Sequence, residues 1–145
     1  MNVSFGEKSA WGLLIGLGAL SWWYFPRAFA VAASTDSPMA LGAISVVCVI
    51  GLVVVEAVYH AIIAGHGGDA KDERDRYIDR QAERNAGFVL GIALFALVGR
   101  ILATSAMPEL APMQPLVIAV WILFALTVSE LSKVLWQIWY YRTGA

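Results

Sequence analysis

Charged residues and cysteine are both scarce in this sequence of 145 residues. Asp, Glu, Lys and Arg together make up 14% of it, whereas a typical soluble domain carries about 25%. The single cysteine, Cys48, excludes an intrachain disulfide and a cysteine-ligated metal cluster. The net charge of −1 gives no general attraction to nucleic acid. The shortage of charge favours a membrane protein.

Motifs of the common enzyme classes are also missing. There is no Gly-x-Ser-x-Gly nucleophile elbow, no His-Glu-x-x-His, no phosphate-binding glycine loop and no dinucleotide fingerprint. A haem held between two helices by histidines would need a partner for His60, and the other histidine, His66, lies among loop glycines. We therefore expect a non-enzymatic protein without a cofactor. A membrane redox or lipid-modifying enzyme is an alternative.

Long apolar segments dominate the sequence instead. Apolar residues make up 59% of it and concentrate in four runs, at 10–25, 39–64, 86–105 and 115–140. A helix needs about 20 residues to cross the hydrocarbon core of a bilayer. The last three runs meet this length, and the first is interrupted by Pro26 and Arg27 before apolar residues resume. We predict one all-α domain of four transmembrane helices, the first kinked or ending near Pro26.

The basic residues of the short connections indicate an orientation. Lys8 precedes the first run, five basic residues lie between the second and third, and Arg142 follows the fourth. The opposite connections contain at most Arg27. Both termini are therefore predicted on the cytoplasmic side of the inner membrane, with Trp136 and Trp139 anchoring the fourth helix there. A cleaved signal peptide over the first run is the alternative.

The two halves of the sequence resemble each other. A glycine pair begins each odd-numbered run and a glutamate lies in each even-numbered one, at Gly12, Gly16, Gly87, Gly91, Glu56 and Glu130. Corresponding positions are 74 or 75 residues apart. This offset predicts two copies of one hairpin, at about 7–68 and 83–145, related by an axis along the membrane normal. Chance similarity between apolar helices is the alternative. The glycines could bring the first and third helices, or two copies of the chain, close together.

The two glutamates are expected at one depth in the inner half of the bilayer. A charge near the bilayer centre costs about 2.5–3.5 kcal/mol on insertion scales, so such residues need partners or a wet cavity. The predicted polar site consists of Glu56, Tyr59, His60, Ser129, Glu130 and Lys133. It would bind a ligand, respond to protons or line the path of an oligomeric transporter or channel. The alternative is a structural set that only determines helix register.

Two further ligand sites follow from the same residues. Glu56 and His60, four residues apart, could face one metal ion with Glu130 as a third ligand, but two histidines are few and we expect no metal. In the outer half, Arg27 and Arg100 would offer cationic groups to lipid phosphates or an anionic ligand. Extension of both side chains to the outer headgroups is the alternative.

Residues 69–84 form a densely charged cytoplasmic connection. Five basic and six acidic residues alternate there, and no glycine or proline follows until Gly87. We therefore predict a helix that starts near Asp69 and continues into the third transmembrane helix. It is either a solvated extension or a docking surface for a cytoplasmic protein, formed by Asp72, Glu73, Arg74, Asp75, Arg76 and Arg80. Mixed charge argues against a patch for anionic lipid.

This connection also carries a resemblance to a known family. Asp72-Glu73-Arg74-Asp75, followed by Ile78, Ala82 and Arg84 and then a membrane helix, is similar to the loop of an uncharacterised family of small four-helix prokaryotic membrane proteins. The tail Tyr141-Arg142-Thr143-Gly144 resembles the family's tyrosine-arginine-glycine ending, with a threonine inserted. The resemblance covers about residues 70–145. It implies a regulatory or sensing role, since such families are often encoded beside small helix-turn-helix repressors.

Overall fold

The computed structural model contains four α-helices and, over the residues that it describes, no strand. The described residues are 5–34, 37–64, 73–107 and 109–144, with their side chains except those of residues 5, 52, 55, 56, 59, 60 and 62–64. The helices are α1 (Phe5–Ser34), α2 (Pro38–Ala64), α3 (Glu73–Ala106) and α4 (Pro115–Thr143). The all-helical prediction is therefore confirmed.

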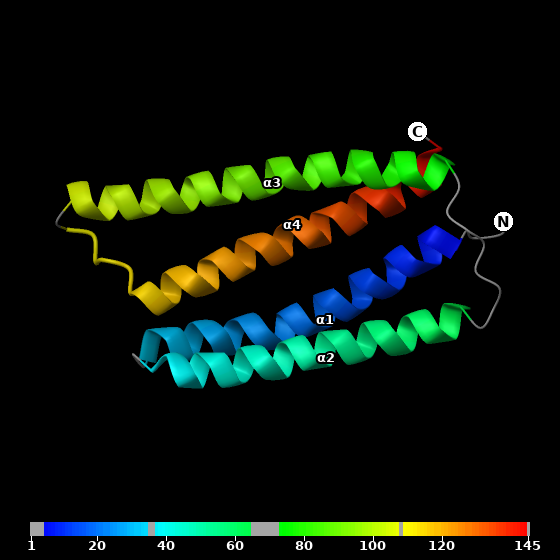
Figure 1. The fold of residues 1–145 in the computed structure, drawn as a ribbon. Helices are drawn as coiled ribbons and strands as arrows, with labels where there is room; N and C mark the ends of the chain where they lie inside the picture. The colour runs from blue at the N-terminus through cyan, green and yellow to red at the C-terminus, as the bar shows by residue number, and fades with distance from the viewer. Residues whose placement is uncertain (1–4, 35–36, 65–72, 108, 145) are drawn as a thin grey trace.

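The four helices run roughly alongside one another in the order α2, α1, α4, α3 (Figure 1). Extensive contacts join each neighbouring pair in this order, and α2 and α3 lie at opposite edges. Both termini lie at the end of the bundle where α3 begins and α2 ends (Figure 1). In a parallel repeat, α1 would correspond to α3 and α2 to α4. The contact between α1 and α4 would then have a counterpart between α3 and α2. In the described residues, extensive contact joins α1 with α4 but not α2 with α3. The repeat therefore stays a prediction.

Two of the helices, α3 and α4, are long and apolar enough to cross a membrane. The described part of α2 that is continuously apolar, Pro38–Gly51, is shorter than a span. The first helix contains Pro26 and Arg27 within its apolar stretch. The predicted spans thus have support from length and composition in two of four cases, and the other two stay predictions.

The first helix continues through Pro26 to Ser34, so the helix end predicted near Pro26 is not observed. Proline removes one backbone hydrogen bond from a helix interior. Packing on both sides of it opposes that cost, because Tyr24, Phe25 and Ala28 are buried in a cluster with residues of α2 and α4. Tertiary burial commonly outweighs local helix propensity in this way.

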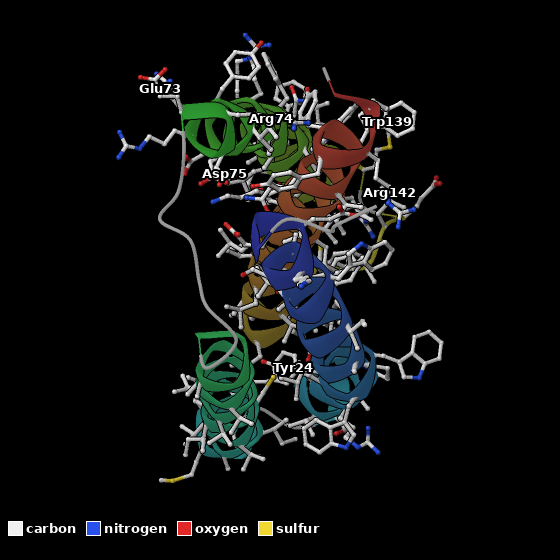
Figure 2. All side chains as sticks on the ribbon, turned by 90° about the vertical axis from the view of Figure 1, so that its right-hand side faces the viewer. Tyr24, Glu73, Arg74, Asp75, Trp139 and Arg142 are labelled. Atoms are coloured by element: carbon white, nitrogen blue, oxygen red, sulfur yellow. The ribbon has the colours of Figure 1, made fainter. Side chains whose placement is uncertain are left out.

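The contact between α1 and α2 includes a polar pair within this apolar cluster. The Tyr24 and Ser45 hydroxyl oxygens are 2.8 Å apart, and Figure 2 shows Tyr24 between the two helices. Ser45 Oγ also donates to the Leu41 carbonyl at 2.9 Å, so Tyr24 is the donor to Ser45. The pair satisfies two hydroxyl groups that would otherwise be costly to bury.

The fourth helix has clear boundary signals. Pro115 is its first residue, after the extended Gln114, and this position needs no backbone N–H. Gly144 ends it in the left-handed conformation with φ of 71°, and its N–H donates to the Tyr140 carbonyl at 3.1 Å. The end of α4 lies beside the beginnings of α1 and α3, where Arg142 contacts Glu7 and Tyr141 contacts Asp75.

Candidate polar site between α1, α3 and α4

Three polar contacts join the beginning of α3 to the end of α4. Each connects an acidic residue of α3 with a donor on α4, in the pairs Asp75–Tyr141 (2.8 Å), Asp79–Gln137 (2.9 Å) and Glu83–Lys133 (3.7 Å). Successive pairs are four residues apart in both helices, and the helices are antiparallel, so the pairs follow one face of each. We call this set the α3–α4 ladder. The first turns of α3, for which a solvated extension was one expectation, therefore pack against α4.

Buried apolar residues of α3 and one hydrogen bond from α4 accompany the ladder. Ile78, Ala82 and Ala86 recur every four residues and are all buried. Beyond the last rung, the buried Ser129 Oγ of α4 donates to the Ala86 carbonyl at 2.9 Å. Ser129 was predicted as a hydrogen-bond partner of an intramembrane ligand site, and the structure places its hydrogen bond in the α3–α4 contact.

A cavity of about 360 Å³ lies between the ladder and the first turns of α1. Its polar lining consists of Asp79, Glu83, Glu130, Lys133, Gln137 and Tyr141, and its α1 wall includes Ser9, Ala10 and Leu13. Three carboxylates and one ammonium group give this lining a formal net charge of −2 when all are ionised. The cavity therefore has the size of a small-ligand site, for which about 300–1,000 Å³ is usual, and a negative electrostatic character.

The beginning of α1 also contacts the end of α4. Arg142 Nε donates to Glu7 Oε1 at 3.2 Å, and its guanidinium lies 5.2 Å from the centroid of the Trp11 ring. Gly6 approaches Tyr141 so closely that a Cβ atom there would overlap the tyrosine hydroxyl. Only glycine therefore lets α1 reach the outermost rung of the ladder in this geometry.

The six residues predicted for the polar site separate into two groups. Glu130 is exposed and lines the cavity, and Lys133 lies beside it in the ion pair with Glu83. Glu130 has no hydrogen bond or ion pair with any residue in the described part of the chain. Ser129, also on α4, lies in the contact with α3. The other three residues belong to α2, and their side chains lie outside those described: Glu56, Tyr59 and His60. The helix that carries them packs extensively on α1, and in the described residues its contact with α4 is slight.

No three described His, Cys, Asp or Glu side chains are grouped closely enough to hold a metal ion. Two of the three conceivable ligands named from the sequence, Glu56 and His60, are among the side chains that the structure does not describe. The third, Glu130, has Asp79 and Glu83 as its carboxylate neighbours around the cavity.

The predicted docking residues at the start of α3 differ in their surroundings. Asp75 is half-buried and accepts the hydrogen bond of Tyr141, on the side of α3 that faces α1 and α4 (Figure 2). Four others are exposed and remain available to a partner: Glu73, Arg74, Arg76 and Arg80. Asp72 and the predicted helix start near Asp69 lie outside the described residues, while the uninterrupted helix into the apolar run is confirmed from Glu73 onward.

The remaining predicted residues lie away from the polar cavity. Gly87 and Gly91 are exposed, and nothing lies within 4 Å of a Cβ atom built on either, so the described structure does not pack them against α1. Their partners in the proposed motif, Gly12 and Gly16, are half-buried. Contact of these glycines between two copies of the chain stays a prediction.

The two outer arginines differ from each other. Arg27 Nη1 donates to the Trp23 carbonyl at 2.7 Å, and the guanidinium lies 4.7 Å from the centroid of the Trp23 ring. Arg100 borders an apolar cavity between α3 and α4 and has no partner among the described residues.

The contacts of the acidic side of the ladder with α4 were not predicted from the sequence. The available signal was the matching spacing of Asp75, Asp79 and Glu83 with Lys133, Gln137 and Tyr141.

Comparison of the chain with models of protein families, with curated proteins and with solved structures gives no match. The family resemblance of the charged segment therefore stays a prediction.

Proposed function

We propose that the chain is a multi-pass inner-membrane protein in which all four helices cross the bilayer. The length and apolar composition of α3 and α4 support this placement. Large apolar side chains also point outward along two edge helices, as at Val46, Ile50, Phe88, Ile92 and Phe95. Continuous apolar surface of this kind is rare on soluble monomers and is suited to lipid.

The proposed orientation has the ladder end of the bundle in the cytoplasm. Basic residues collect at this end, on the first turns of α3 and at Arg142, as the positive-inside rule requires. Trp136 stacks on Tyr140 with 5.9 Å between ring centroids, and Trp139 is exposed at the same end. Tryptophan and tyrosine are enriched at membrane interfaces, so these rings support the same depth.

Within this membrane protein, the polar cavity is the proposed ligand site, and a small organic cation is the proposed ligand. The observation that carries the proposal is the Glu130 carboxylate, which lines the cavity without a partner among the described residues. Asp79 and Glu83 add negative charge, and Ala10, Leu13 and Val134 would contact an alkyl group. A cation with a short apolar body matches both properties of the lining.

The proposed role is non-enzymatic sensing. A ligand in the cavity would contact Asp79 and Glu83, which are themselves rungs of the ladder. The same helix presents the exposed Arg74, Arg76 and Arg80 at its cytoplasmic end. Occupation of the cavity would thus be coupled to a surface that a cytoplasmic protein can bind, through one continuous helix.

Ligand-dependent stability of the full chain tests the proposed site. The purified protein in detergent is unfolded by heat in n-butylammonium chloride and in sodium chloride of equal ionic strength. Butylammonium at tenfold excess over its dissociation constant is expected to stabilise the wild type by about 1.4 kcal/mol. Glu130→Gln should remove this stabilisation and keep the helical circular dichroism of the wild type.

Glu109→Gln is the matched control, because Glu109 is exposed in the connection between α3 and α4 and does not line the cavity. It removes the same charge and should leave the butylammonium effect intact. Equal responses of the two variants, or no response of the wild type, would contradict the proposal.

A second candidate is an oligomeric transporter or channel. The open face around Gly87 and Gly91 favours it, since small residues let helices of two subunits approach closely. It requires a dimer or larger assembly in native lipid. A monomer there would leave the sensing role as the better account.

A further inference from the structure

Two cavities lie along the α3–α4 contact, and their linings differ in polarity: one is polar and acidic, and the other is apolar with a single arginine. The second cavity, of about 530 Å³, lies toward the connection at 107–114, where α3 and α4 diverge (Figure 1). Its α3 wall is formed by Ala93, Ala96 and Leu97, and its α4 wall includes Trp121 and Phe124. Small side chains on one helix opposite large rings on the other leave an open apolar groove along the pair.

The aromatic wall of this groove is held rigidly. The Trp121 and Phe124 rings meet edge-on with centroids 5.6 Å apart, and Phe124 meets Phe25 of α1 in the same way at 4.9 Å. Edge-to-face aromatic contacts of this kind stabilise ring positions beyond simple area burial. The aromatic wall of the groove is therefore formed by the packing of α4 against α1.

One cation borders the groove, and it has no counter-charge. Arg100 is exposed and lines the cavity without an ion pair or hydrogen bond to any described residue. Arg27, the other outer arginine, contacts a carbonyl and a ring of its own helix. Arg100 precedes the end of α3 by six residues, or about 9 Å at 1.5 Å per residue. A charge at that depth in a bilayer calls for an anionic partner.

We propose that this groove is a binding site for one anionic phospholipid, with an acyl chain along Ala93, Ala96 and Leu97 and the headgroup phosphate at Arg100. The lining matches such a molecule, because it is apolar throughout except for a single guanidinium, which binds phosphate oxygens bidentately. The volume lies within the usual range of about 300–1,000 Å³ for ligand sites.

A second copy of the chain fits the groove less well. It would have to bring an acidic side chain to Arg100, and Glu109 is the acidic residue that the described structure has at this end of the bundle. Glu109 lies in the connection after α3, beyond the depth of Arg100. A soluble anion would satisfy Arg100 but leave the apolar walls uncovered. A phospholipid satisfies both.

The proposal rests on the membrane placement of α3 and α4 but not on the cation site at the other end of the bundle. Loss of butylammonium binding in Glu130→Gln would therefore leave it untouched. Loss of lipid selectivity at Arg100 would likewise leave the cation site untouched. The two proposals can fail separately.

Native mass spectrometry of the full chain in mild detergent provides the test. The protein is mixed with equal amounts of phosphatidylglycerol and phosphatidylcholine that carry identical acyl chains. The wild type should retain phosphatidylglycerol about tenfold more often than phosphatidylcholine, because both lipids offer a phosphate but the choline cation of phosphatidylcholine repels the Arg100 guanidinium. Arg100→Gln should reduce this ratio to about one, and Arg100→Lys should keep part of it.

Arg27→Gln is the matched charge control and should keep the wild-type ratio, because Arg27 already has partners on its own helix. Ala96→Phe fills the groove and should lower retention of both lipids. Val98→Phe adds the same ring at a position that is 52% exposed and outside the cavity lining, and should lower neither.

Four results would overturn the proposal. The first is an unchanged lipid ratio in Arg100→Gln, and the second is an equal loss of selectivity in Arg27→Gln. The third is a dimer whose formation excludes lipid, since a second copy would then cover the groove. Displacement of the lipid by millimolar inorganic phosphate would also count against it, because the acyl chain would then contribute nothing.

Discussion

Tyr141 and Asp75 are 66 residues apart in the sequence, and their side chains are joined by a hydrogen bond of 2.8 Å. The tyrosine hydroxyl donates to the Asp75 carboxylate at the point where α3 begins and α4 ends. Gly6 of α1 approaches the same hydroxyl. The Asp75–Tyr141 pair therefore lies where three helices meet, the beginnings of α1 and α3 and the end of α4.

Tyr141→Phe removes the donor of this rung and keeps the ring. The expected loss in free energy of unfolding is about 1.5–3 kcal/mol, because the acceptor is a charged group. The measurement is reversible unfolding of the purified chain in mixed micelles. Tyr77→Phe is the control, since Tyr77 is exposed and has no hydrogen bond with the described residues. Equal losses in the two variants would show that the rung contributes nothing.

Gly6→Ala introduces a Cβ atom that overlaps the Tyr141 hydroxyl. Overpacking of this kind costs about 1–3 kcal/mol. Gly18→Ala is the control, because nothing lies within 4 Å of a Cβ at that position; there the helix should gain up to about 1 kcal/mol. In a Tyr141→Phe background, the cost of Gly6→Ala should fall but not disappear, since the hydroxyl oxygen is gone and the ring carbon that carried it would still overlap the added Cβ. Additive costs would mean that the hydroxyl oxygen contributes nothing to the overlap.

Ser129→Ala removes the buried hydrogen bond from α4 to the Ala86 carbonyl of α3. Interhelical hydrogen bonds in membrane proteins contribute about 0.6 kcal/mol on average, so a loss of that order is expected. Ser132→Ala is the matched variant, because Ser132 Oγ donates to the Ser129 carbonyl within its own helix at 2.7 Å. A cost of Ser132→Ala as large as that of Ser129→Ala would argue against a specific interhelical role.

Lys133→Gln removes the positive charge from the cavity lining and changes its formal charge from −2 to −3. Affinity for butylammonium should rise by a few-fold, the scale of a partly exposed charge pair. Isothermal titration of the purified chain measures it. Lys8→Gln removes the same charge from α1 outside the lining and should change the affinity less. A fall in butylammonium affinity in Lys133→Gln would contradict a cation site in this cavity.

The helices themselves could be predicted from the sequence. Each of the four apolar runs lies within one observed helix, and Pro115 and Gly144 mark the ends of α4. The continuous helix from Glu73 into the apolar run followed from the absence of glycine and proline. These features depend on local signals, which a single sequence carries in full.

Which faces meet could not be predicted, because that depends on contacts between distant segments. The matching glutamates suggested a contact between α2 and α4, but α2 packs on α1 at the edge of the row. Charge alternation suggested solvent around Asp75 and Asp79, although both contact α4. The spacing of four residues in each helix predicts these pairs only when α3 and α4 are already known to be neighbours.

Cysteine accessibility in intact cells tests most directly the claim that α3 crosses the membrane with its ladder end in the cytoplasm. Cys48 is replaced by alanine, and one cysteine is introduced as Glu109→Cys or as Arg80→Cys. Both positions are exposed, at opposite ends of α3. A membrane-impermeant maleimide should label the Glu109→Cys variant in intact cells and the Arg80→Cys variant only after permeabilisation. The reverse pattern, or equal labelling of both, would contradict the account.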